Sequence, residues 1–94
     1  MAICVHIPTP LRRFTAGQDR VAVEGTTVTE LLRNLEATHP GIRDRLYDGS
    51  GELRHFVSIF ANDTDIRLLD GPETALHDGD EVSILPALAL AARR

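Results

Sequence analysis

The side chains that could carry reactive chemistry are few in this sequence. There is one cysteine, Cys4, and there are four histidines, His6, His39, His55 and His77. A reactive cysteine needs a neighbouring base or cation that favours the thiolate, and no histidine stands at a spacing from Cys4 that predicts one. The histidines also lack the paired spacing of metal ligands. We therefore expect an inert, partly covered thiol, locally hydrogen-bonded or solvated histidines, and no metal site.

Four aspartates form two Asp-x-Asp patterns, Asp63 with Asp65 and Asp78 with Asp80. Both patterns lie in segments that predict turns, where an aspartate side chain accepts hydrogen bonds from its own nearby backbone. A calcium ion needs more oxygen ligands than either pattern supplies. We interpret these aspartates as turn residues and not as a cation site.

The charge pattern excludes several further kinds of chemistry. All ten cationic side chains are arginines, so the chain offers no lysine amine for an isopeptide bond, a Schiff base or general-base catalysis. The net charge is −4, whereas a domain that binds nucleic acid usually carries a basic excess. The chain also shows no nucleotide-binding loop and is too short to build a deep pocket. We predict no nucleic-acid partner, no cofactor and no enzymatic activity of its own.

A chain of 94 residues with 43% hydrophobic residues forms one small globular domain. No apolar run approaches the ~20 residues that a membrane span needs. The first residues lack the charged and apolar regions of a secretory signal. A single cysteine forms no internal disulfide and suits a reducing compartment. We expect a cytoplasmic protein without a membrane partner.

Apolar periodicity predicts the elements that position these side chains. Residues 2–8 and 20–24 both alternate, which predicts two strands of a hairpin with Cys4 and His6 on the face away from the core. A capping box at residues 27–30 then predicts the start of a helix that ends near a Pro-Gly pair. The apolar face of this helix has four members at helical spacing, which are Val28, Leu31, Leu32 and Leu35.

The second half of the chain predicts strands at residues 56–61 and 81–85, with a short strand at 66–69 and a tight turn at 74–76 between them. Strands segregated from one helix indicate an α+β domain in which the helix covers one face of the sheet. The order is the outline of a ubiquitin-like β-grasp, with a mixed four- to five-stranded sheet packed on one main helix. Periodicity alone leaves a split βαβ arrangement open.

Five segments, taken in order, carry a family resemblance. They are IPTPLRR at 7–13, TAG at 15–17, HPGI at 39–42, FVSIFAND at 56–63 and LHDGDEVSILP at 76–86. Together they resemble the ThiS/MoaD-type sulfur carriers, and within that family the CysO type, which serves cysteine biosynthesis. The resemblance covers residues 3–87. It is specific for the family and leaves the pathway open among cysteine, thiamin, molybdopterin, tRNA thiolation and secondary metabolites.

The resemblance implies a β-grasp fold and a shuttle role. In such carriers an adenylating, E1-like enzyme activates the C-terminal carboxylate, and sulfur then replaces the adenylate to give a thiocarboxylate. A sulfur-accepting synthase takes the sulfur. The family's tail ends in Gly-Gly, because glycine lets the backbone thread a narrow channel close to ATP. The expected partners are therefore the activating enzyme and the synthase.

The tail of this chain departs from that pattern. Residues 85–94 read LPALALAARR, so that Leu90 and Ala91 stand where the family has its two glycines. No two glycines are adjacent anywhere in the chain, so proteolytic trimming cannot expose such an ending. Leu90 places a branched side chain where a channel of glycine width is expected. Arg93 and Arg94 add two cations to an end that is small and neutral in the family.

We predict a ubiquitin-like β-grasp domain over residues 1–87 and a C-terminal tail at 88–94. Six residues alternate away from the predicted core, which are Cys4, His6, Ser58, Phe60, Ser83 and Leu85. The predicted docking surface combines the apolar members of this face with the start of the tail, which are Phe60, Leu85, Pro86 and Leu88. Ubiquitin-like proteins commonly bind through this face, and the alternative is that Phe60 packs against a loop or the tail.

The resulting functional prediction is a sulfur carrier for cofactor or cysteine biosynthesis that acts through its tail and docks on an adenylating enzyme. The alternative is a non-carrier β-grasp module that binds or regulates a partner after losing the reactive Gly-Gly end.

Overall fold

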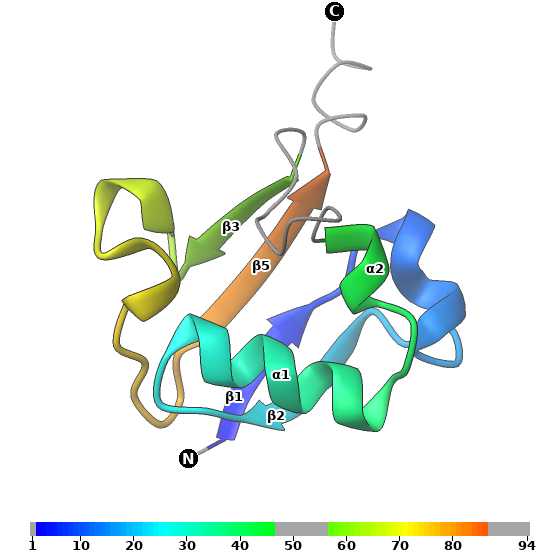
Figure 1. The fold of residues 1–94 in the computed structure, drawn as a ribbon. Coiled ribbons are helices and arrows are strands. Elements are labelled where there is room, and N and C mark those ends of the chain that lie inside the picture. Colours follow the sequence, from blue (N-terminus) through cyan, green and yellow to red (C-terminus); the bar gives the residue numbers. More distant parts are fainter. Residues whose placement is uncertain (1, 47–56, 87–94) are drawn as a thin grey trace, which may run out of the picture.

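The chain folds into two layers, a five-stranded sheet and a helical layer that packs against one of its faces (Figure 1). The computed structural model describes residues 2–46 and 57–86. The strands are β1 (Ala2–His6), β2 (Arg20–Glu24), β3 (Val57–Ala61), β4 (Thr64–Asp65) and β5 (Glu81–Pro86). The helices are α1 (Val28–Thr38) and α2 (Arg43–Leu46), with the 3-10 helices η1 (Thr9–Phe14), η2 (Ile66–Leu68) and η3 (Gly71–Glu73).

The strands follow the order β2-β1-β5-β3-β4 across the sheet. The neighbours β1 and β5 are parallel, with Val5 opposite Val82, and the other pairs are antiparallel. The last strand therefore lies in the middle of the sheet, beside the first. This topology, with α1 across one face, is a β-grasp and not a split βαβ arrangement. The predicted α+β class and the four- to five-stranded sheet are confirmed.

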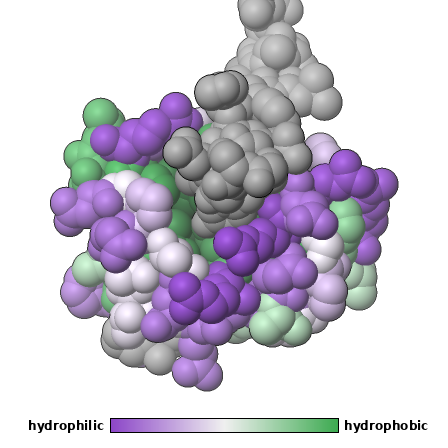
Figure 2. All heavy atoms as spheres, viewed as in Figure 1, coloured by the Kyte–Doolittle hydropathy of each residue, from purple (hydrophilic) through white to green (hydrophobic). Residues whose placement is uncertain are grey.

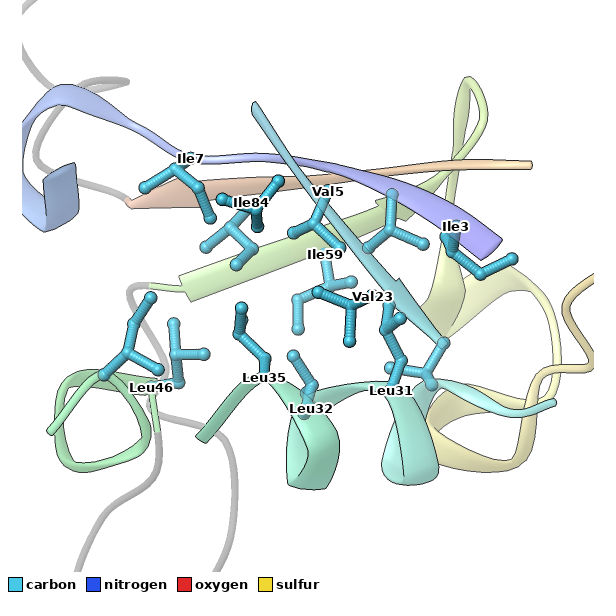
Figure 3. Packing of buried hydrophobic residues seen from close by; sticks show 14 of the residues in the cluster. Ile3, Val5, Ile7, Val23, Leu31, Leu32, Leu35, Leu46, Ile59 and Ile84 are labelled. Atoms are coloured by element: carbon cyan, nitrogen blue, oxygen red, sulfur yellow. The ribbon is translucent and has the colours of Figure 1, made fainter. Parts of the chain in front are cut away.

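The hydrophobic core lies between the sheet and α1. Alternation along the strands buries Ile3 and Val5 completely and leaves Cys4, which stands between them, half-buried. Figure 3 shows strand residues such as Ile59 and Ile84 on the sheet side of this core, facing the leucines of the helix. The predicted apolar face of the helix is buried at all four positions, which are Val28, Leu31, Leu32 and Leu35.

Side-chain caps and one glycine fix the start of α1. Thr27 is the N-cap, and its Oγ1 accepts a hydrogen bond from the backbone N–H of Glu30 at 3.2 Å. The Glu30 carboxylate accepts in return from the N–H of Thr26 at 2.9 Å, one residue earlier than a capping box predicts. A Cβ at Gly25 would lie 2.8 Å from the backbone of Leu31. The close approach of the end of β2 to α1 therefore requires glycine.

A carboxylate ties the end of α1 to α2. Glu36 accepts hydrogen bonds from the backbone N–H of Gly41 at 2.9 Å and of Arg43 at 2.8 Å. These two bonds lower the pKa of Glu36, partial burial opposes them, and the charge of Arg43 adds a smaller lowering. Gly41 has a φ of +101°, and a Cβ there would lie 3.0 Å from the Phe14 ring. Glycine thus allows both the turn and the packing of η1 against it.

The predicted strand at residues 66–69 is wrong, because this segment forms η2. Asp65 accepts a hydrogen bond from the N–H of Arg67 at 2.9 Å, which caps a helical turn, and Ile66 is buried beneath it. The short strand of this region is β4, which precedes the turn and pairs with the end of β3.

The predicted tight turn at residues 74–76 is also wrong, because the segment is extended. Ala75 forms an isolated antiparallel bridge with Thr27, and the N–H of Leu76 donates to the carbonyl of Thr26 at 2.9 Å. The backbone hydrogen bonds that a local turn would make are thus made across the fold to the start of α1.

The predicted start of the third strand at Phe56 and the predicted domain boundary between 87 and 88 fall outside the described residues. No helix in the described ranges is long and apolar enough to cross a membrane.

Candidate docking face

The candidate site is the face of the sheet that points away from α1. Strand alternation places half-buried side chains there from β1, β3 and β5. The parallel pairing of β1 with β5 and the antiparallel pairing of β5 with β3 join them into one surface. Its members are those assigned by alternation, which are Cys4, His6, Ser58, Phe60, Ser83 and Leu85. Their shared face is therefore confirmed.

Phe60 and Leu85 are the large apolar side chains of this face. The register of β3 with β5 sets Phe60 opposite Ser83 and Leu85 opposite Ser58, so the two apolar residues are diagonal neighbours. Diagonal positions on adjacent antiparallel strands lie about 7–8 Å apart, within reach of an aromatic side chain. Both residues are half-buried. They form a small apolar patch between two serines rather than a broad hydrophobic surface.

An ionisable pair lies on the β1 side of this patch. Nε2 of His6 is 2.7 Å from Oε1 of Glu81, across the parallel pairing of β1 and β5. The His6 side chain is 36% exposed and that of Glu81 is 59% exposed. Because both groups meet water, the pair contributes little to the free energy of unfolding. Its effect is to orient the imidazole, which stands opposite Arg20 of β2 on the same face.

A shallow hollow of about 240 Å³ lies toward β2 from this pair. The small side chains of Ala2, Cys4 and Ala22 line it, with Arg20 and Gly79 among its other neighbours. The Cys4 thiol is free and half-buried. A small-molecule site is concave and encloses most of its ligand. This open hollow is suited instead to a side chain of a docked protein.

The strand β5 leads from this face into the C-terminal residues. It pairs with a neighbour on each side, and its last residue, Pro86, stands opposite Val57. Central strands with many buried contacts belong to the most stable parts of a fold, so β5 gives the C-terminal residues a rigid base. Leu88, Leu90 and Ala91 lie outside the described residues, and their predicted roles stay predictions.

Two exposed leucines lie outside the predicted docking surface. Leu68 is 80% exposed and Leu69 is 47% exposed, at the end of η2. In a strand at residues 66–69, one of these two leucines would be buried. The wrong secondary-structure prediction therefore did not indicate that both are exposed. An apolar pair next to Asp70 is the sequence signal that could have indicated an exposed turn.

The described residues hold no group of three or more histidine, cysteine, aspartate or glutamate side chains placed to bind a metal ion. The side chains of this face thus offer contacts for a protein: an apolar patch, an oriented imidazole and a hollow lined by small residues.

The topology and this outer face define the class first. A β-grasp whose final strand is central and leads directly into the C-terminal residues is a ubiquitin-like protein, and the solved structures that match this chain have the same fold. Within this class the chain belongs to the ThiS family, which matches residues 5–89. The family predicted from the motif series is confirmed.

Individual relatives match along nearly the whole chain. The chain is 47% identical to the sulfur carrier protein CysO of Mycobacterium tuberculosis over 91 aligned residues. The aligned residues cover 95% of this chain and 98% of that protein. The crystal structure of Mycobacterium tuberculosis CysO matches with a TM-score of 0.86 over 90% of this chain and 98% of that chain, again at 47% identity. The crystal structure of an Amycolatopsis orientalis BexX/CysO complex matches with a TM-score of 0.86 and 41% identity over 92% of this chain and 96% of that chain.

Proposed function

We propose that this protein is a sulfur carrier of the CysO type. It accepts sulfur as a C-terminal thiocarboxylate after activation by an adenylating enzyme and delivers the sulfur to a biosynthetic acceptor, with cysteine biosynthesis as the favoured pathway. The support is the sequence identity to CysO over nearly its full length and the placement of β5. The carrier supplies no acid, base or nucleophile, because its reactive group is the terminal carboxyl, and we therefore propose that it is not itself an enzyme.

The single observation that carries the proposal is the position of the last strand. β5 is paired with β1 from Glu81 to Ser83 and with β3 from Val82 to Pro86, so the residues after it follow directly from a central strand of the sheet. A tail that must enter an enzyme's channel gains from such a base, because the fold holds its root in one place. We propose that the patch of Phe60 and Leu85, together with Pro86, docks the carrier while the tail enters.

The tail sets a condition on the activating enzyme. Leu90 and Ala91 occupy the places of the two glycines, so an enzyme that activates the native tail has a channel wide enough for a leucine side chain. An enzyme built for Gly-Gly carriers rejects it by steric overlap. The same domain with a Gly-Gly ending fits both channels, that of the enzyme for the native tail and that of the enzyme for Gly-Gly carriers.

A tail variant tests this proposal. The chain with Leu90→Gly and Ala91→Gly that ends at residue 91 is incubated with ATP and an adenylating enzyme that activates a Gly-Gly carrier of this family. We expect the acyl-adenylate, detected by intact mass. The matched control is the same shortened chain with its native Leu90 and Ala91, for which we expect none. If the glycine variant forms no acyl-adenylate, the carrier function is wrong.

A second candidate function is suggested by the same two positions. A β-grasp without adjacent glycines can act as a binding or regulatory module that docks on a partner enzyme and transfers nothing. This candidate requires the outer face of the sheet and not the end of the tail. It is favoured if removal of the last residues leaves partner binding unchanged.

We place either function in the cytoplasm. Cys4 is a free, half-buried thiol on the proposed docking face, and a reducing compartment keeps it from forming disulfides with other proteins.

A further inference from the structure

Charged side chains are sorted between the two ends of the sheet. Because β1 and β5 are parallel, both strands finish at the same end of the sheet, where η1 follows β1 and the chain leaves β5 at Pro86. We name this end of the sheet the tail end. The opposite end, where β1 and β5 begin and β3 finishes, is the far end. Figure 1 shows η1 and α2 side by side near the tail end.

The tail end is basic. Arg12 and Arg13 lie on η1, Arg43 and Arg45 lie on α2, and Arg20 begins β2 opposite the end of β1. Three carboxylates lie in the same region, on Asp19, Glu36 and Asp44, and that of Glu36 accepts the two backbone hydrogen bonds that join α1 to α2. Among the described residues, arginines outnumber carboxylates here even without Arg20, in a chain whose net charge is −4.

The Phe14 ring gathers two of these arginines. The guanidinium carbon of Arg13 lies 5.0 Å from the ring centroid and that of Arg45 lies 5.8 Å from it. Two cations that share one ring are no more than about 11 Å apart, within a distance at which their fields add. Arg12 lies on the same 3-10 helix as Arg13, and its Nε donates to the carbonyl of Ile7 at 3.1 Å.

The packing beneath the ring makes this arrangement rigid. Gly41 leaves room for the ring edge, and η1 and α2 thereby pack against each other. Arg13 and Arg45 are both exposed, so their charges face the solvent. Figure 2 shows hydrophilic residues over much of this side of the molecule, at the right of the view.

The far end is acidic. The N–H of Ala2 donates to Asp78 at 3.0 Å, and the hydroxyl of Thr29 donates to the carbonyl of Pro72 at 3.0 Å, which places η3 beside the start of α1. Arg20 of β2 lines one hollow with Gly79 and Asp80 and therefore borders this end. The carboxylates of the far end are those of Glu24, Glu30, Asp63, Glu73, Asp78, Asp80 and Glu81.

We infer that the arginine cluster of Arg12, Arg13 and Arg45 at the tail end binds an acidic segment of the partner protein that receives the tail. This inference rests on the proposed function, since it is the tail that gives the partner a reason to meet this end. The tail end is positive and the far end is negative. As the molecule approaches an acidic surface, its positive tail end therefore turns toward that surface. The acidic surface of the partner repels the acidic far end at the same time, which disfavours binding in the reversed orientation.

The probe is a decaglutamate peptide, titrated into the full chain at low ionic strength and followed by amide NMR. We expect the shift changes to gather in η1 and α2. The variant Arg13→Gln with Arg45→Gln keeps the aliphatic stems on the Phe14 ring and removes two charges. We expect it to weaken peptide binding by about fivefold or more. Its thermal unfolding midpoint shows that the fold is retained.

The control variant carries the same change in net charge at the other end. Ala75→Glu with His77→Glu alters two exposed residues of the far end. We expect peptide affinity within about twofold of the wild type, because these charges lie roughly the length of the sheet away and are screened. Equal weakening by both variants, or shift changes outside η1 and α2, overturns the inference.

Inorganic pyrophosphate is titrated in parallel. If it binds the same residues more tightly than the peptide, the cluster is a phosphate site and the assignment to an acidic protein is wrong. The peptide experiment needs neither sulfur nor the tail residues. Its failure therefore leaves the carrier function standing, and failure of the glycine-tail variant leaves this inference standing.

Discussion

Single residues decide which contacts the outer face can make. Alternation in the sequence correctly predicted that Phe60 and Leu85 share a face, because the side-chain period of a strand is two. It did not predict that they are diagonal or that His6 pairs with Glu81, because both depend on the register between strands far apart in the chain. At this scale the sequence predicts which side chains face outward and not their neighbours.

Phe60→Ala tests the proposed docking role at the residue scale. Removing the ring takes away the larger half of the apolar patch, and truncation of an aromatic anchor in an interface costs about 2 kcal/mol or more of binding free energy. We expect affinity for a partner of the carrier to fall at least tenfold, measured by calorimetry. Ser83→Ala, at the position directly opposite, is the matched control and should change it little. A stable complex that is indifferent to Phe60 counts against this face.

Elements were predicted well where the apolar pattern was long and poorly where it was short. The pattern of four apolar residues on α1 runs over about two turns at helical spacing and predicts a helix. The segments 66–69 and 74–76 are too short for a period, and their structure is set by Asp65 capping a turn and by Ala75 bridging to Thr27. The first of these contacts is local and the second joins distant segments, so neither appears in the periodicity.

The junction of α1 with α2 gives a prediction that depends on pH. Glu36→Gln keeps the shape of the side chain and removes the charge that two backbone N–H groups share. Because the pKa of Glu36 is lowered in the folded state, its stabilisation is present above the unfolded pKa of about 4.3 and is lost as the pH falls through the folded value. We expect the variant to lose about 1 kcal/mol of unfolding free energy at pH 7.

Urea unfolding at neutral and strongly acidic pH measures this effect. The difference between wild type and Glu36→Gln should shrink in acid, where the wild-type carboxyl is protonated as well. Glu73→Gln, an exposed carboxylate on η3, serves as the control and should cost little at either pH. An equal loss for Glu36→Gln at both pH values contradicts the role assigned to its charge.

The whole molecule adds properties that no single segment contains. The net charge was known from composition, but its division into a basic tail end and an acidic far end results from the parallel pairing of β1 and β5. The same pairing places the last strand in the centre and gives the tail its rigid base. The motif series predicted the family and hence the fold, whereas the departure at Leu90 and Ala91 was visible only in the sequence.

The most direct test of the carrier function is the intact mass of the untagged protein isolated from its own cells. The carrier function predicts a fraction whose mass corresponds to one terminal oxygen replaced by sulfur, on the native end or on a shortened one. That result would also mean that the activating enzyme accepts a tail without glycine. A chain that runs to Arg94 and carries only an ordinary carboxylate, under conditions of active sulfur assimilation, would contradict the carrier function and favour the binding module.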